Sequence, residues 1–304
     1  MNSFTFNFNE MKKLFIKLVF FLIPLCLYLS ANLCYNYDRY RNESVNLGPI
    51  EDLIIGDSQL MTALNPFLFK NAVNVCQSGE PLIVSYWKLK KISNSSKPLR
   101  VYLGFSPHTI SSYNEHKFSD KKWAQDIFRK IYPIQDLNSI SARVEIDFTS
   151  FYKTLFKQNA FYPKTKHTNY LGCFIKKTSS DVSNWELRTN QHFFYQEKLV
   201  GKSQITLDYL DSIIDLCQQF DLSLTLLGSP LHRNYYSNIP QSFLIDYKVT
   251  KAELEQRGIC IIDKSDGSSY SDSLFYDSNH LNQMGANRFT TEVLKLFISQ
   301  GKFN

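Results

Sequence analysis

The sequence predicts an α/β protein with a flavodoxin-like, three-layer fold, in which a five-stranded parallel sheet carries helices on both faces. Three observations predict it. Short apolar runs of strand length alternate with segments of helical spacing. Several of these runs stop at a glycine, as strands do when they turn tightly into a helix. The chain has 304 residues, 43% hydrophobic and 20% charged, which suits one sizeable domain plus an appendage and excludes a disordered chain.

The N-terminal segment, residues 1–35, is predicted to be a cytoplasmic tail and a transmembrane signal anchor. Its apolar run, residues 18–34, reaches roughly twenty residues when residues 14–16 are included, which is enough to span a bilayer. Lysines on the N-terminal side predict a cytoplasmic N-terminus and an extracytoplasmic domain, in the periplasm or at the cell surface. These lysines are Lys12, Lys13 and Lys17.

A cleaved signal peptide is the alternative to an anchor. Residues 30–32, Ser-Ala-Asn, form only a poor cleavage site, so we favour the anchor. Residues 36–50 are polar and aromatic, and we expect them to be a stalk between the membrane and the domain, residues 51–304.

The first strand of the domain, residues 53–55, stops at Gly56 and is followed at once by Asp57 and Ser58. A helix-like segment, residues 59–64, comes next. Strand, tight turn and helix together lift a serine hydroxyl above the edge of a parallel sheet, with a helix N-terminus beneath it. Gly-Asp-Ser is also ordinary turn chemistry, so these residues alone leave a plain turn as the alternative.

Two further strands continue the alternation of strand and helix. Residues 72–76 form the second, which leads through a loop containing Gly79 into a helix at residues 82–92. The third strand, residues 99–103, ends in Gly-Phe-Ser-Pro, which places Ser106 just beyond the sheet.

The alternation is lost between residues 108 and 201. This stretch is rich in aromatic residues and lysine and is far longer than an ordinary connection, with a helix-like piece at residues 121–131. We expect an insertion over the carboxyl edge of the sheet, where α/β folds keep their ligands. Its aromatic side chains either stack on sugar rings or form the core of a small cap.

The alternation of helix and strand then resumes, with a helix at residues 204–220 and the fourth strand at residues 222–227. The loop after this strand carries His232, which could contact a substrate. A helix at residues 243–257 and the fifth strand at residues 259–262 complete the predicted sheet.

The composition limits the classes of partner and ligand that we expect. The net charge of +6 is modest and no basic block is dense enough for a nucleic-acid surface, so we expect no nucleic-acid partner. The six cysteines show no spacing of a zinc site or a disulfide framework. Four histidines have no metal-ligand spacing with Cys, Asp or Glu, and we treat them as surface or cap residues, with no metal site. They are His108, His116, His167 and His192.

A second chemical motif lies near the C-terminus, where Asp277 and His280 precede an amphipathic helix at residues 281–298. A serine nucleophile needs a base, and the base needs a carboxylate that holds it in the right tautomer. An acid three residues before a histidine can supply both to Ser58.

At this point the chain resembles the SGNH (GDSL-type) hydrolase superfamily, over roughly residue 51 to the C-terminus. The first block of that superfamily is Gly-Asp-Ser after the first strand, and its last is Asp-x-x-His before the C-terminal helix. The resemblance implies a catalytic triad of Ser58, His280 and Asp277. It also implies an oxyanion hole from the backbone N–H groups of Ser58 and Gly79.

One block departs from the family pattern. The third block is Gly-x-Asn-Asp, whose asparagine donates to the oxyanion, and this chain has Ser106 and Pro107 there. The Ser106 hydroxyl is the candidate replacement donor, and losing one such donor typically costs about a hundredfold in rate. Asp57 and His232 are candidate substrate contacts. The departure resembles divergent, membrane-anchored branches of the superfamily.

The expected function is therefore ester hydrolysis or O-acyl transfer on acylated carbohydrate of the cell envelope, without a metal or organic cofactor. A membrane-bound acyltransferase is a candidate partner. The alternative is a non-catalytic envelope protein that keeps the fold and binds glycan or such a partner. Nucleotide binding is a weaker alternative, since the chain has no glycine-rich phosphate loop.

Overall fold

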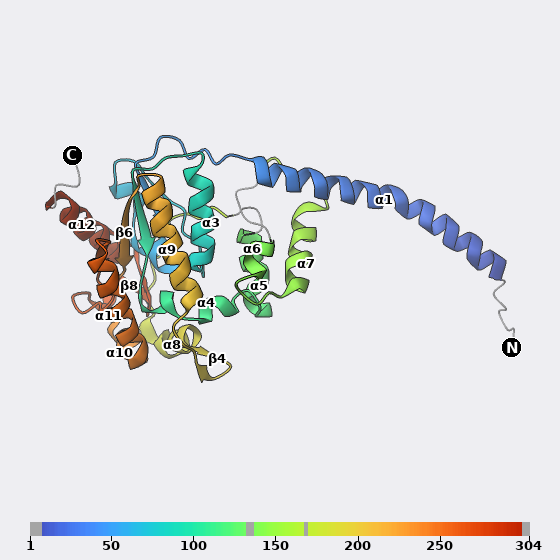
Figure 1. Ribbon diagram of the computed structural model, residues 1–304. Coiled ribbons are helices and arrows are strands. Elements are labelled where there is room, and N and C mark those ends of the chain that lie inside the picture. The colour runs from blue at the N-terminus through green and yellow to red at the C-terminus, as the bar shows by residue number, and fades with distance from the viewer. Residues whose placement is uncertain (1–7, 132–136, 167–169, 300–304) are drawn as a thin grey trace.

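The computed structural model describes residues 8–131, 137–166 and 170–299. Its body is a five-stranded sheet in the order β2-β1-β3-β6-β7. Figure 1 shows helices packed around this sheet. All four neighbouring pairs run parallel, which confirms the predicted fold class and strand order. The strands are β1 (Asp52–Ile55), β2 (Ala72–Asn74), β3 (Arg100–Gly104), β6 (Ser223–Gly228) and β7 (Cys260–Asp263).

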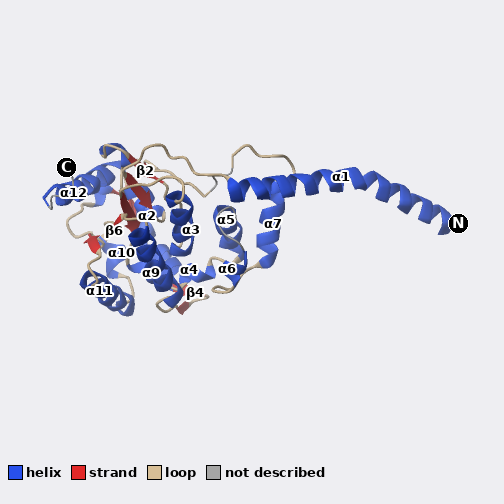
Figure 2. Ribbon diagram, turned by 45° about the horizontal axis from the view of Figure 1, so that its top comes forward, coloured by secondary structure: helices blue, strands red, loops and turns tan. Residues whose placement is uncertain are grey.

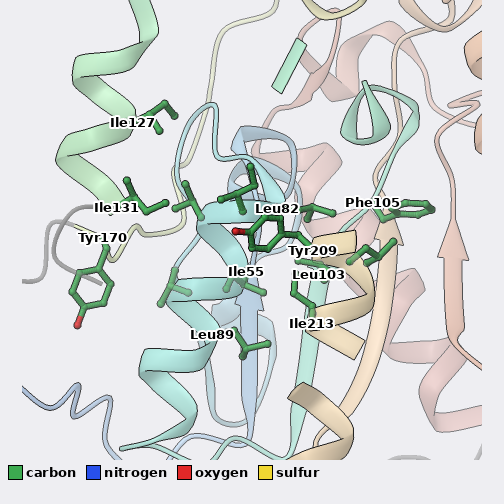
Figure 3. Close-up of a cluster of buried hydrophobic side chains, with 14 of the residues drawn as sticks. Ile55, Leu82, Leu89, Leu103, Phe105, Ile127, Ile131, Tyr170, Tyr209 and Ile213 are labelled. Atoms are coloured by element: carbon green, nitrogen blue, oxygen red, sulfur yellow. The ribbon is translucent and has the colours of Figure 1, made fainter. Parts of the chain in front are cut away.

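The strands send alternate side chains into two apolar layers, one on each face of the sheet. On β1, Leu53 and Ile55 pack into the larger layer and Ile54 into the smaller one. Figure 3 shows Ile55 in the larger layer among side chains of α3 and α9, such as Leu89 and Ile213. Helices α3, α9 and α11 cover the larger layer, and α2 and α12 cover the smaller one. Their bounds are α2 (Ser58–Ala63), α3 (Leu82–Ser93), α9 (Gln204–Gln219), α11 (Gln241–Gln256) and α12 (Gln283–Ser299).

The last helix begins two residues later than the expected residue 281. Residues His280–Leu281 instead form β9, which pairs antiparallel with β8 (Phe275–Asp277). Asn282 then accepts the backbone N–H of Gly285 at 3.1 Å and so starts the helix. The short elements η1 (Pro66–Leu68), α10 (Arg233–Ser237) and η4 (Asp272–Leu274) connect the larger ones.

The segment between β3 and α9 is mostly helical, and its helix α5 has the predicted bounds. Phe118, Phe128 and Phe151 are buried in the larger layer, with ring centroids 6.2 Å apart in the first pair and 5.3 Å in the second. These three rings therefore pack as core and do not offer a sugar-stacking surface. The elements are η2 (Pro107–Ile110), α4 (Tyr113–His116), α5 (Lys121–Ile131), α6 (Leu137–Ser141), α7 (Phe148–Asn159), η3 (Val182–Asn184), α8 (Trp185–Phe193), β4 (Phe194–Tyr195) and β5 (Lys198–Leu199).

The N-terminal helix, α1 (Phe8–Asn42), extends away from this body (Figure 2). An 18-residue window in it has a mean hydropathy of 2.3, so by length and composition α1 can cross a membrane.

The helix continues through residues 36–42, where we expected a stalk. The side-chain amide of Asn36 donates to the carbonyls of Asn159 and Tyr162, each at 2.8 Å, and Asn32 donates to the carbonyl of Ala160 at 3.0 Å. The carbonyls at the end of a helix have no partners inside it. The polar residues of this stretch therefore satisfy the end of α7, and α1 is fixed against the domain.

Candidate active site

Ser58 is the first residue of α2, immediately beyond the carboxyl end of β1. The turn requires Gly56, whose φ is +146° and where an added Cβ would lie 3.1 Å from the backbone nitrogen of Gly104 on β3. Asp57 caps α2, because its Oδ1 accepts the N–H of Gln59 at 2.9 Å. The first strand thus delivers a half-buried serine to a helix N-terminus at the edge of the sheet.

The structure brings Ser58, His280 and Asp277 together. Nε2 of His280 lies 2.8 Å from Oγ of Ser58, and its Nδ1 lies 2.8 Å from Oδ1 of Asp277. The β8–β9 pairing holds Asp277 opposite His280, and the N–H of Asn279 also donates to Asp277, at 3.0 Å. The His280 side chain is 11% exposed, so it is largely buried but still reaches solvent. With a proton on Nδ1 shared with Asp277, Nε2 is free to accept the proton of Ser58.

Electrostatics keep Asp277 ionised. Burial raises its pKa, but the hydrogen bond and charge of His280, the Asn279 N–H and Arg188 together lower the pKa below its ordinary value. Arg188, on α8 of the inserted segment, lies 3.6 Å from Oδ2 of Asp277. Nothing local in the sequence marked Arg188, since it is 89 residues from the acid that it contacts (277 − 188).

Arg188→Gln is expected to weaken the pH dependence of stability that Asp277 contributes. A carboxyl with a depressed folded pKa stabilises the fold above its unfolded pKa, about 4, and loses that contribution as pH falls through the folded pKa. The variant should therefore melt below wild type at neutral pH, and the difference should vanish in acid. Thermal melts across the acid range test this, with Arg233→Gln, at a 73% exposed arginine, as control. A difference that is the same at every pH would contradict it.

Gly79 lies in the loop between β2 and α3, with a left-handed φ of +67° that glycine adopts readily. Three lysines donate to carbonyls along this loop: Lys88 to Val75 at 2.7 Å, Lys117 to Gly79 at 3.1 Å, and Lys130 to Ser78. The Ser78 carbonyl and the Gly79 N–H belong to one peptide group. A cation on that carbonyl polarises the peptide, which makes the Gly79 N–H a stronger donor.

Burial lowers the pKa of two of these lysines, Lys88 and Lys117. It lowers the pKa of Lys117 to about 8, while Asp57 opposes that change and Lys130 adds to it. None of the three could be identified from the sequence, because Lys88 on α3, Lys117 at the end of α4 and Lys130 on α5 converge on the loop only in the folded chain.

Ser106 lies in a buried chain of hydrogen bonds. Ser106 is only 2% exposed, and its hydroxyl is 2.9 Å from Oε1 of Gln59 and 2.8 Å from Nδ1 of His108. Nε2 of His108 is in turn 2.6 Å from Oδ2 of Asp57. The single hydroxyl hydrogen of Ser106 is therefore used within this chain, and the expected role as an oxyanion donor has no support from this geometry.

His108 and Asp57 thus have structural partners that the sequence analysis did not foresee. His108 is 6% exposed, so of the two places expected for it, surface or cap, the surface is excluded. Burial raises the pKa of Asp57, but the charge and hydrogen bond of His108, with Lys117 and the Gln59 N–H, lower that pKa below its ordinary value. One signal could have found His108: it lies in the loop that follows the third strand, at the carboxyl edge of a parallel sheet.

The other histidines occupy different places. His232 is 1% exposed, caps α10 and has Nε2 3.2 Å from Asp272, so it is not placed to contact a substrate. The ring of His192 stacks on His108 with centroids 4.8 Å apart, and that of His116 stacks on Tyr195. His167 lies outside the described residues. Within the described ranges, no group of three His, Cys, Asp or Glu side chains could hold a metal.

No family model and no curated protein matches the chain. Solved structures do align with the chain, among them the following three from bacteria. A protein provisionally described as a platelet activating factor from Streptococcus pneumoniae aligns at 10% identity and a TM-score of 0.43, over 92% of this chain and 98% of that one. A provisionally described acylhydrolase from Bacteroides fragilis aligns at 10% identity and a TM-score of 0.42, over 88% and 95%. A lipase/acylhydrolase from Enterococcus faecalis aligns at 12% identity and a TM-score of 0.39, over 83% and 97%. At such similarity, any chemistry has to be inferred from the site itself.

Proposed function

We propose that this chain is a membrane-anchored serine esterase or O-acyltransferase of the SGNH type. The observation that supports this most directly is one line of contacts, from Ser58 Oγ to His280 Nε2 at 2.8 Å and from His280 Nδ1 to Asp277 Oδ1 at 2.8 Å. Nucleophile, base and orienting acid lie in the order that acyl transfer requires.

The reaction is two-step acyl transfer. Ser58 Oγ attacks the carbonyl carbon of an ester while its proton passes to His280 Nε2. The tetrahedral intermediate collapses, the bond to the alcohol oxygen breaks, and His280 returns the proton to that alcohol. Water or a sugar hydroxyl then attacks the acyl-Ser58 ester and gives its proton to His280. The bond between the acyl carbon and Ser58 Oγ breaks, His280 returns the proton to Oγ, and the free acid or the new ester leaves.

The oxyanion is assigned to the backbone N–H groups of Ser58 and Gly79. Ser58 contributes as the first residue of a helix, where N–H groups lack partners inside the helix. Gly79 contributes a peptide polarised by Lys130 at the Ser78 carbonyl. This cationic surrounding is what the site offers in place of the missing third-block asparagine.

The location and substrate follow from the N-terminus and the resemblance. We assign α1 as a single membrane span, with its flanking lysines in the cytoplasm and the domain outside, in the periplasm or at the cell surface. The substrate class is an acylated carbohydrate or envelope polymer, and a membrane-bound acyltransferase is the candidate partner. No cofactor has a role in this chemistry.

A second function, a non-catalytic envelope protein that binds glycan or an acyltransferase, is favoured by one observation. Ser106 stands where the superfamily has its asparagine and is hydrogen-bonded to Gln59 and His108, so a side-chain oxyanion donor is lacking there.

Labelling with a fluorophosphonate probe separates the two functions. The full chain in detergent should be labelled covalently, because an activated serine attacks the phosphorus of the probe, displaces fluoride and becomes phosphonylated. Ser58→Ala should lose the label, and Ser237→Ala, a change at an exposed serine of α10, should keep it. An unlabelled wild type that also fails to hydrolyse p-nitrophenyl acetate would favour the binding protein, and a label that persists in Ser58→Ala would remove Ser58 as the nucleophile.

A further inference from the structure

The outer face of α7 carries a row of exposed aromatic side chains. Phe148 is 51% exposed, Tyr152 56% and Phe156 42%. They recur every four residues and so form one stripe along the helix, which we call the α7 stripe. The opposite face is buried: Phe151 packs against Phe128 of α5, with ring centroids 5.3 Å apart. Large aromatic side chains exposed in a row mark an interaction surface.

The contacts with α1 show which way the stripe faces. The hydroxyl of Tyr28 donates to the carbonyl of Phe161 at 2.9 Å, and Asn36 donates to that of Asn159 at 2.8 Å. The end of α7 is therefore held beside the C-terminal part of the apolar stretch of α1. In Figures 1 and 2, α7 runs crosswise to α1, with α5 on one side of it and the N-terminal part of α1 extending from the other. The face of α7 turned away from α5 is thus turned toward the side from which that part of α1 extends.

The chemistry of this face suits one occupant, a bilayer surface. Aromatic side chains concentrate at the boundary between lipid headgroups and acyl chains. Phe161 and Tyr162, beside α1, are 53% and 60% exposed and continue the aromatic surface. Next to the stripe, α7 presents exposed Lys153 and Lys157 and has no acidic residue. Lysines beside an apolar helix face attract anionic headgroups.

We propose that α7 is an interfacial helix that lies on the same bilayer that α1 crosses. The α7 stripe enters the headgroup boundary, and Lys153 and Lys157 contact lipid phosphates. Continuity with α1 selects the bilayer over a glycan or a second copy of the chain, because an inserted α1 brings this face to the membrane surface. The domain is then held at two places and cannot swing freely about its anchor. This inference rests on the proposed membrane span.

Quenching by brominated lipids tests it on the full chain, reconstituted in phosphatidylcholine vesicles with phosphatidylglycerol. A tryptophan is added at one of three sites, and the signal of the three native tryptophans, measured on wild type, is subtracted. Phe156→Trp reports on the stripe and Leu22→Trp on the span. Ile245→Trp, at a 53% exposed residue of α11, is the matched control. We expect about twofold quenching or more for the first two, since bromine quenches only tryptophans within the bilayer, and none for the control.

Each of the other outcomes contradicts one defined part of the proposal. Quenching of Leu22→Trp without Phe156→Trp would refute the interfacial helix and leave the anchor intact. If neither is quenched, α1 does not span, and the proposed anchoring fails with it. Lys153→Glu with Lys157→Glu should reduce quenching of Phe156→Trp in the anionic vesicles, and Lys248→Glu on α11 should not. If Phe156→Trp is quenched equally with the native lysines, with Lys153→Glu and Lys157→Glu, and with Lys248→Glu, the proposed phosphate contacts are refuted.

Discussion

Asp277→Asn is expected to lower the rate of acylation of Ser58 about ten-thousandfold, through loss of the correct tautomer of His280. Asp277 accepts from His280 Nδ1 at 2.8 Å and is ionised, so it both orients the ring and stabilises its protonated form. An asparagine of the same size removes the charge and can donate its own N–H to Nδ1, which would leave the proton on Nε2, facing Ser58. The backbone position would hardly change.

The measurement is the second-order rate of fluorophosphonate labelling, together with kcat/KM on p-nitrophenyl acetate. Asp272→Asn is the matched control, because Asp272 contacts a histidine that takes no part in the triad, His232, and is half exposed. Its rate should stay close to that of wild type. A rate for Asp277→Asn within tenfold of wild type would show that His280 does not depend on this acid.

Breaking the buried pair of Glu80 and Lys88 is expected to cost about 3–5 kcal/mol of unfolding free energy for either single variant, Glu80→Gln or Lys88→Met. Both side chains are 0% exposed. Burial raises the pKa of Glu80 and lowers that of Lys88, each toward its neutral form, and their mutual attraction opposes both changes. Removing one partner leaves the other buried without its counter-charge.

The double variant Glu80→Leu with Lys88→Met should be less destabilised than either single variant, since both desolvation costs disappear together. Urea unfolding of the full chain in detergent measures all three. Glu292→Gln is the control, because the pair that Glu292 forms with Arg288 is partly exposed and should contribute less than about 1 kcal/mol. A loss in the double variant equal to the sum of the two single losses would mean that the two charges do not interact.

This pair also bears on the proposed chemistry. Glu80 follows Gly79 in the chain, and Lys88 donates to the carbonyl of Val75 in the same loop. The Glu80 and Lys88 variants should therefore lose labelling rate as well as stability, because the loop that presents the Gly79 N–H would relax.

Much of the sheet could be predicted because its signals are local. Short, mainly apolar runs of three to six residues that stop at Gly56, Gly104 and Gly228 mark strands whatever the rest of the chain does. Ser58 and His280 were found for a similar reason: a nucleophile and its base each occupy a short motif next to a strand or a helix.

The partners of these residues could not be found in the same way. His108 contacts Asp57, which is 51 residues away in the sequence, and Asn36 donates a hydrogen bond to the end of α7, 123 residues away. A histidine or an asparagine carries no mark of which distant group it will contact. The stalk was expected for this reason, because a polar stretch has the same composition whether it is solvated or packed against a helix end.

The sequence by itself determined the order and type of the main elements and the three residues proposed for catalysis, because hydrophobic period and turn chemistry act over a few residues. The tertiary structure alone decided what surrounds them: the lysines on the Gly79 loop, Arg188 beside Asp277, the use of Ser106 within a buried chain, and the way α1 holds α7. Those contacts depend on how the inserted segment packs over the sheet, and packing is a property of surfaces that form only when the chain has folded.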